Sequence, residues 1–148
     1  YQLPGVEAID VGCGSGILSI AAGKLGSPYV LAVDIDPESV KATHENAAAN
    51  GVTDGLEIGS GSVAEIKVGN FSRKSAPLVV VNILAPVILR LFDAGLSDLV
   101  DAGGLLILSG ILEEQADGVV QRGIDAGYTL LEKALIKDWV VLVLKKQG

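Results

Sequence analysis

The sequence predicts an open α/β fold, with a sheet of seven mostly parallel strands, an antiparallel last strand and helices on both faces. Short apolar runs alternate along the chain with stretches of helical period, which is typical of parallel sheets. The first apolar run also enters a glycine-rich turn at residues 12–16 and continues directly as a helix. Folds with such a turn bind ligands outside the carboxyl ends of their strands, so we expect a binding site there.

Three strands and two helices are predicted in the first half of the chain. Strands nearly continuous in apolar residues are expected at Val6–Val11, Tyr29–Val33 and Leu56–Ile58. The first helix, Gly16–Leu25, should bury a stripe formed by Ile17, Ile20, Ala21 and Leu25. The second helix, Glu38–Asn50, follows the N-terminal signal Asp36-Pro37 and carries the only histidine, His44, on a solvated face.

The second half predicts four strands and two helices, with no helix between the third and fourth strands. The strands are expected at Pro77–Val81, Leu105–Leu108, Tyr128–Leu135 and Trp139–Leu144. The helices are expected at Glu113–Ala126 and at Val87–Leu99, the latter with Ile88, Leu91, Phe92, Leu96 and Leu99 inward. A tight connection joins the last two strands, which makes the last strand antiparallel. We expect Trp139 to lie in the core.

Composition limits the class of protein. A length of 148 residues suits one domain, and the longest uncharged run, residues 75–89, is too short and too interrupted to span a membrane. No signal peptide opens the chain, and its single cysteine cannot form an internal disulfide, so we expect a cytoplasmic protein. The net charge of −7 argues against a broad nucleic-acid-binding face and suits a basic protein partner.

The start of the chain indicates a longer parent protein. The sequence begins with Tyr1, only a few residues before the glycine turn, and contains no methionine. We therefore expect residues 1–5 to be a residual linker and residues 6–148 to form the folded domain.

The glycine turn and Asp34 indicate an adenosyl cofactor. In the turn, backbone groups of Gly12, Cys13, Gly14 and Gly16 can approach a ligand closely. A dinucleotide fingerprint would need a small residue at the position of Ile17, and a P-loop would need a lysine that is missing. Asp34 ends the second strand 22 positions after Gly12, a spacing that lets a carboxylate accept both ribose hydroxyls.

Other polar residues at strand ends are further candidates. Asp10, at the end of the first strand, is expected either to bond the glycine loop or a cofactor ammonium, or only to cap the turn. Cys13 is expected to be a small, partly buried filler. Ile35 follows Asp34, and the loop with Ser62 and Val63 follows the third strand, where such folds contact an adenine ring.

Asn82 ends the fourth strand, which lies beside the first strand in such sheets, so it should project over the cofactor. The alternative is an ordinary cap for the next helix. With one histidine and one cysteine, we expect no metal site.

The order of elements resembles that of the Rossmann-like class I methyltransferases, and the Asp-x-Gly-x-Gly turn is similar to their first motif. Four longer stretches resemble the ribosomal protein L11 methyltransferase family. They are Asp34-Ile-Asp-Pro37 followed by residues 46–51, Val81-Asn-Ile-Leu-Ala-Pro86, Leu108-Ser-Gly-Ile-Leu-Glu-Glu-Gln115 and the closing strand Trp139–Leu144.

The resemblance implies that S-adenosylmethionine is the cofactor and that lysine side chains and the N-terminal amine of ribosomal protein L11 are methylated. Gly12 and Asp34 would contact the cofactor. The Asn82 side chain and the Ile83 carbonyl would orient the amine. Family members also carry an N-terminal recognition domain and a threonine-containing loop that closes over the cofactor, and both are missing from this sequence.

Three alternatives remain at this point. A glutamine or nucleobase N-methyltransferase typically has paired prolines and an aromatic residue after the strand-four Asn or Asp, and Asn82-Ile-Leu-Ala has neither. A nicotinamide-dependent oxidoreductase is disfavoured by Ile17. A non-catalytic adenosyl-binding module would lack chemistry at Asn82. The sequence leaves the oligomeric state open.

Overall fold

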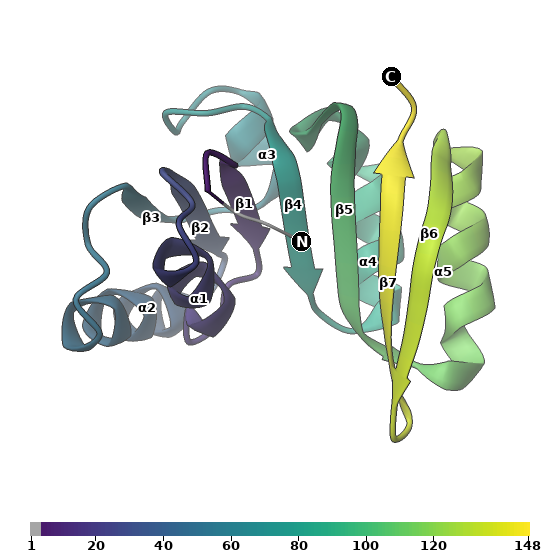
Figure 1. Cartoon of the computed structure of the whole chain (residues 1–148), viewed down its shortest axis with the longest axis horizontal. Coiled ribbons are helices and arrows are strands. Elements are labelled where there is room, and N and C mark those ends of the chain that lie inside the picture. Colours follow the sequence, from purple (N-terminus) through teal and green to yellow (C-terminus); the bar gives the residue numbers. More distant parts are fainter. Residues whose placement is uncertain (1–3) are drawn as a thin grey trace.

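The computed structural model describes residues 4–148, so residues 1–3 of the predicted linker lie outside the described residues. One seven-stranded sheet has the strand order β3-β2-β1-β4-β5-β7-β6 (Figure 1). The strands are β1 (Ala8–Val11), β2 (Val30–Asp34), β3 (Leu56–Ser60), β4 (Ala76–Asn82), β5 (Val100–Leu112), β6 (Tyr128–Ile136) and β7 (Trp139–Lys146). Strands β1 to β5 pair in parallel, and β7 is antiparallel to both neighbours, so the predicted sheet is confirmed.

The helices lie on both faces of this sheet, as predicted. They are α1 (Ile17–Lys24), α2 (Pro37–Ala49), α3 (Val63–Lys67), α4 (Ala85–Asp93) and α5 (Glu113–Asp125), with a 3₁₀ turn, η1 (Leu96–Leu99). Figure 1 shows α1 in front of the sheet and α4 and α5 behind it. Within residues 4–148, no helix is long and apolar enough to cross a membrane.

The order of the strands creates the crevice in which this fold binds ligands. β1 pairs with β2 on one side and with β4 on the other, so the chain changes direction at β1. The carboxyl ends of these three strands therefore meet at one edge of the sheet, with connections leading away on both sides.

The main core lies between the sheet and the helices α3, α4 and α5. Alternate strand residues face this layer, among them Ile9, Leu31, Val79 and Leu106, none of which has exposed area. Burying one such side chain contributes about 1.5–3 kcal/mol. On the opposite face, Ala8, Val30 and Leu78 form a smaller cluster with Ala22 of α1. The larger core therefore holds the sheet against α3, α4 and α5, and the smaller cluster packs α1 against the opposite face.

The predicted apolar stripe of α1 is wrong. Ile17 is 70 % exposed and Leu25 is 62 % exposed, although Ile20 is buried. The small residues Ser19 and Ala22 are buried beside Ile20. Gly23 packs closely on the segment after α2, since an added Cβ would lie 2.7 Å from Cγ1 of Val52. Hydrophobicity alone could not reveal this close approach.

Several other boundaries differ from the prediction. The fifth strand, expected at Leu105–Leu108, extends over Val100–Leu112 as β5. The loop after the third strand continues as α3, and the N–H of Ser62 donates to Oε1 of Glu65 at 2.7 Å, half of a capping box. The helix expected at Val87–Leu99 ends early, because Gly95 adopts a φ of 101° and separates α4 from η1. The residues expected to face inward from this stretch are indeed buried or half-buried.

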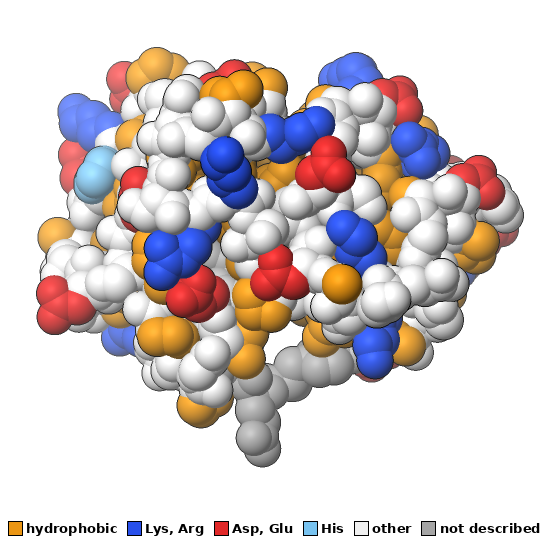
Figure 2. Space-filling model, turned by 90° about the horizontal axis from the view of Figure 1, so that it is seen from above, with side chains coloured by type: hydrophobic (Ala, Val, Ile, Leu, Met, Phe, Trp, Pro, Cys, Tyr) orange, Lys and Arg blue, Asp and Glu red, His pale blue; other side chains and the backbone are white. Residues whose placement is uncertain are grey.

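Basic and acidic side chains are mixed on the edge where β1 and β4 begin (Figure 2). Three ion pairs join such side chains among residues 4–148: Lys67–Asp98, Arg73–Glu7 and Arg122–Asp93. These pairs are exposed to solvent and contribute little to stability.

Candidate functional site

The glycine turn is held tightly between β2 and the segment after β4. Gly12, Gly14 and Gly16 have φ values of 75°, 57° and 84°, a region that favours glycine. The N–H groups of Gly12 and Cys13 both donate to the carbonyl of Val33, at 2.8 and 2.9 Å. An added Cβ at Gly12 would lie 2.9 Å from Cδ1 of Ile83. The turn therefore requires glycine for both its dihedral angles and its packing.

Asp34 is fixed at the carboxyl end of β2 by two backbone donors. The N–H of Gly14 donates to its Oδ2, and the N–H of Asp36 donates to its Oδ1, both at 2.9 Å. Each carboxylate oxygen keeps further acceptor capacity for a ligand hydroxyl. The carboxylate is therefore pre-oriented and able to accept two hydroxyl groups.

A cavity of about 270 Å³ opens at this edge of the sheet. It brings together five residues that the sequence predicted for the site: Gly12, Asp34, Ile35, Ser62 and Ile83. Gly61, also in the cavity lining, belongs to the loop that was expected to contact an adenine ring. The remaining lining residues, Val11, Val87 and Leu91, were not predicted for the site. One carboxylate beside a largely apolar wall suits a nucleoside, whose ribose is polar and whose base has apolar faces. The amphipathic pattern of α4 placed Leu91 on the inward face of the helix, and we therefore assigned this side chain to the core rather than to the site.

Four residues predicted for the site, Cys13, Gly14, Gly16 and Val63, do not line this cavity. The Cys13 side chain is buried, with its Sγ 3.4 Å from Oγ1 of Thr43, and burial raises the pKa of its thiol to about 11. The side chain of Val63 has no exposed area and belongs to the core beneath α3. Gly16 lies against Thr43 of α2. Gly14 acts through its N–H on Asp34, and Cys13 is the buried filler that the sequence predicted.

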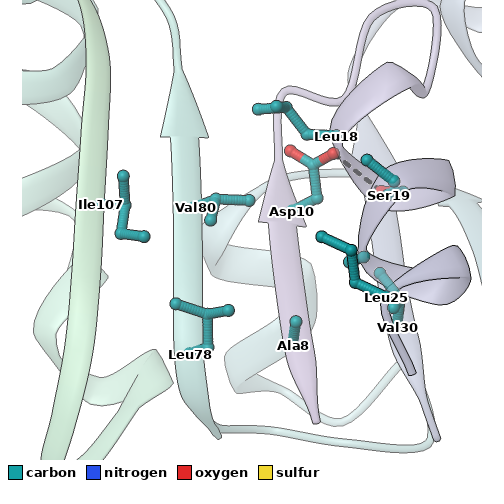
Figure 3. A pocket seen from close by; sticks show the side chains of 11 residues that line it. Ala8, Asp10, Leu18, Ser19, Leu25, Val30, Leu78, Val80 and Ile107 are labelled. Carbon is teal, nitrogen blue, oxygen red and sulfur yellow. Dashed lines mark hydrogen bonds between the residues drawn. The ribbon is translucent and has the colours of Figure 1, made fainter. Parts of the chain in front are cut away.

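Asp10 lies in a different groove, between α1 and the strands β1 and β4 (Figure 3). It is 1 % exposed, and the Ser19 hydroxyl donates to its Oδ2 at 2.7 Å. Among residues 4–148, no hydrogen-bond partner reaches Oδ1. Burial in this apolar groove raises the pKa of the carboxyl to about 6. Asp10 therefore anchors α1 through Ser19 and does not line the cavity beside Asp34.

A second cavity, of about 630 Å³, lies on the other side of the end of β4. Its lining residues are Asn82, Ser109, Gly110, Ile136, Lys137, Trp139, Val140 and Val141. Asn82 is exposed and does not cap α4, whose N-cap is Leu84. An exposed amide at the end of a buried strand is thus available to a ligand.

The prediction that Trp139 lies in the core is wrong. It is 46 % exposed and lines the cavity of Asn82. Trp139 is the first residue of β7 and pairs with Ile136 at the closed end of the β6–β7 hairpin. That end extends past the carboxyl end of β4 (Figure 1), so the indole lies beside the crevice. Its position next to a tight turn was a sequence signal for this location.

Asn82 and Ile83 connect the two cavities, because Asn82 lines one and Ile83 the other. Gly110 lies where the register of the β5–β7 pairing shifts, and its lack of a side chain leaves room for the end of β4. An added Cβ at Gly110 would lie 2.6 Å from the Ile83 carbonyl oxygen and 3.1 Å from Oδ1 of Asn82. Two hydrogen-bond acceptors of the β4 end thus lie beside the second cavity. Within the described part of the chain, no group of three His, Cys, Asp or Glu side chains could hold a metal ion.

The comparisons with known proteins agree with this geometry. The family model described as "Ribosomal protein L11 methyltransferase (PrmA)" matches residues 1–147. The chain is 41 % identical over 146 residues to a ribosomal protein L11 methyltransferase of Thermotoga neapolitana, covering 99 % of this chain and 52 % of that protein. It is 42 % identical over 141 residues to the protein of that name from Methylococcus capsulatus, covering 95 % of this chain and 45 % of the relative. The chain thus spans about half the length of these curated relatives.

Solved structures give the same result. The crystal structure of ribosomal protein L11 methylase from Lactobacillus delbrueckii subsp. bulgaricus superposes with a TM-score of 0.86 at 34 % identity, covering 100 % of this chain and 73 % of that chain. A tRNA m1G37 methyltransferase of M. jannaschii, at 20 % identity and a TM-score of 0.82, shares the fold alone. The chain therefore belongs to the ribosomal protein L11 methyltransferase family.

Proposed function

We propose that residues 6–148 form a catalytic domain that transfers a methyl group from S-adenosylmethionine to amino groups of ribosomal protein L11. The observation that carries the proposal is the position of Asn82 and Ile83 between two cavities. A nucleoside-sized site with a fixed carboxylate lies on one side, and a pocket with exposed acceptors lies on the other. Transfer between two bound molecules requires such an arrangement.

In this proposal the smaller cavity holds the adenosyl part of the cofactor. Asp34 accepts hydrogen bonds from the ribose, and the N–H groups that orient its two oxygens come from Gly14 and Asp36. The base contacts Ile35 and Ser62, which line the same cavity as Asp34. Because Gly12 carries no side chain, the turn can lie close to the ligand. When bound, the cofactor supplies a methyl group already activated on a sulfonium.

The residues of the second cavity position the acceptor amine. The Asn82 Oδ1 and the Ile83 carbonyl accept N–H hydrogens, which directs the nitrogen lone pair toward the methyl group. An ammonium has no lone pair, so the amine enters neutral and the product releases its extra proton to water. S-adenosylhomocysteine would be the leaving group once the methyl group is on the amine nitrogen. The apolar surface of Trp139 contacts the alkyl chain of the substrate lysine.

The charge of the chain supports a protein substrate. A net charge of −7 favours encounter with a basic protein and disfavours a nucleic acid. The relatives named for L11 are about twice as long as this chain, and we propose that their additional part recognises the substrate. A ribosomal protein substrate places the activity in the cytoplasm, which agrees with the single cysteine.

The test is transfer of labelled methyl groups from S-adenosylmethionine to purified L11, with tRNA as a competing acceptor. The longer protein that carries this domain should label L11 and leave tRNA unlabelled. The Asn82→Ala variant should lower turnover about 10- to 100-fold, the effect of losing one strong hydrogen bond in the transition state. Its affinity for S-adenosylhomocysteine should be unchanged, because Asn82 lines the other cavity. Labelled tRNA with unlabelled L11 would refute the substrate, and normal turnover by Asn82→Ala would refute the role of the amide.

A further inference from the structure

The glycine turn is held from below by a single buried side chain of α2. Thr43 has no exposed area, and its hydroxyl donates to the carbonyl of Gly14 at 2.9 Å. One helical turn later, Nδ2 of Asn46 donates to the carbonyl of Ser15, also at 2.9 Å. Two consecutive carbonyls of the turn are therefore tied to the same face of α2.

Thr43 also fills the space beneath the turn. An added Cβ at Gly16 would lie 2.6 Å from Cγ2 of Thr43, and Sγ of Cys13 lies 3.4 Å from its hydroxyl oxygen. Three positions of the turn, Cys13, Gly14 and Gly16, thus contact this one side chain. The hydroxyl bonds the backbone, while the methyl group provides shape.

The hydrogen bonds connect Thr43 to Asp34 through one residue. The Gly14 carbonyl accepts from Thr43, and the Gly14 N–H donates to Oδ2 of Asp34. These two groups belong to the peptide units on either side of the Gly14 α-carbon. Glycine has the greatest conformational freedom of any residue, and Gly14 has a φ of 57°. Restraint of one peptide unit by Thr43 therefore limits how far the other can rotate away from Asp34.

We infer that Thr43 is a positioning residue for the cofactor, which holds Gly14 so that its N–H orients the Asp34 carboxylate toward the ribose. The inference rests on the proposed function, because Asp34 is the ribose ligand only there. Thr43 itself does not line the cavity and touches no reacting atom. Its effect is on cofactor affinity.

Two substitutions separate the hydroxyl from the shape. Thr43→Val keeps both branches of the side chain and removes the donor, so S-adenosylhomocysteine should bind about 3- to 10-fold more weakly, the loss of one ordinary hydrogen bond. Thr43→Ser keeps the donor and should bind within about twofold of the wild type. Ser97→Ala is the matched control, because it removes a hydroxyl bonded to Tyr128 at the other end of the strands. This control should destabilise the chain without altering affinity.

A double-substitution cycle distinguishes positioning from general destabilisation. On an Asp34→Ala background, Thr43→Val should no longer weaken ligand binding, because the group that it positions is absent. The decrease in the thermal midpoint caused by Thr43→Val should persist on that background. Calorimetric titration and thermal unfolding of the four proteins provide both readouts.

The experiment distinguishes failure of the positioning role of Thr43 from failure of the proposed function. If the wild-type chain fails to bind S-adenosylhomocysteine, the proposed function is wrong. If the wild type binds and Thr43→Val binds equally well, or if the variant weakens binding by the same factor on both backgrounds, the positioning role of Thr43 is wrong.

Discussion

Replacement of Asp10 by Asn should change how stability depends on pH. Asp10 is 1 % exposed, and one of its oxygens has no hydrogen-bond partner among residues 4–148. Burial, together with the nearby charge of Asp34, raises its pKa from 3.8 to about 6, although the Ser19 hydroxyl partly opposes this. Folding therefore favours the protonated carboxyl.

Because the pKa of Asp10 is raised on folding, the free energy of unfolding should decrease as the pH rises. Between pH 3.8 and about 6 the folded state binds more protons at Asp10 than the unfolded state does. The stabilising contribution is complete below pH 3.8 and is lost as the pH rises through 6. A shift of about two units corresponds to about 3 kcal/mol.

The Asp10→Asn variant lacks this titration but loses some stability at every pH. One end of the buried amide would be without a partner, which costs about 1–3 kcal/mol at every pH. That cost could cancel any absolute gain in stability at neutral pH. This cost does not depend on pH. The stability difference between the wild type and Asp10→Asn should therefore still change by about 2 kcal/mol between pH 4 and pH 7.

The measurement is urea unfolding followed by circular dichroism at several pH values, with the free energy extrapolated to water. The wild type should lose stability relative to Asp10→Asn as the pH rises. The exposed Asp117, on α5, provides the control: Asp117→Asn should follow the wild-type profile. Parallel profiles for the wild type and Asp10→Asn would refute the reasoning that burial governs this carboxyl.

Two further substitutions test the cavity beside Asn82. Gly110→Ala should destabilise the chain by about 1–3 kcal/mol, because Gly110 has a φ of 82° and an added Cβ would lie 2.6 Å from the Ile83 carbonyl oxygen; unfolding in urea measures this, and wild-type stability would contradict it. Trp139→Ala should raise the KM for L11 while leaving affinity for S-adenosylhomocysteine unchanged, because the indole lines only the second cavity. Methyl-transfer kinetics and calorimetry check this. Weaker binding of S-adenosylhomocysteine with an unchanged KM for L11 would contradict the assignment of Trp139 to the substrate cavity.

The sequence was sufficient to predict the sheet and the edge of it at which the candidate site residues lie. Continuous apolar runs determine where parallel strands end, and Asp34 and Asn82 occupy two such ends. Their different surroundings follow from strand order, because β1 separates β2 from β4. The roles of the two side chains remain predictions until they are measured.

What could not be predicted depends on contacts between distant segments. Ile17 is exposed although it belongs to an apolar helix, and Gly23 of the same helix packs closely on Val52, a contact between distant segments. The Ser19 hydroxyl donates to Asp10, a bond between α1 and β1 that no local pattern specifies. Trp139 lies beside the second cavity because the hairpin extends past β4 (Figure 1). Its place next to the tight turn was a sequence signal, but no local pattern specifies how far the hairpin extends.

The most direct test of the central claim is calorimetric titration of the chain with S-adenosylhomocysteine and, separately, with NAD. We expect S-adenosylhomocysteine to bind more tightly than NAD. The Asp34→Ala variant should weaken that binding by about one to two decades, because strong hydrogen bonds to a charged group contribute about 1.5–3 kcal/mol each. Tighter binding of NAD, or equal binding by the wild type and Asp34→Ala, would contradict the assignment of this cavity to the methyl donor.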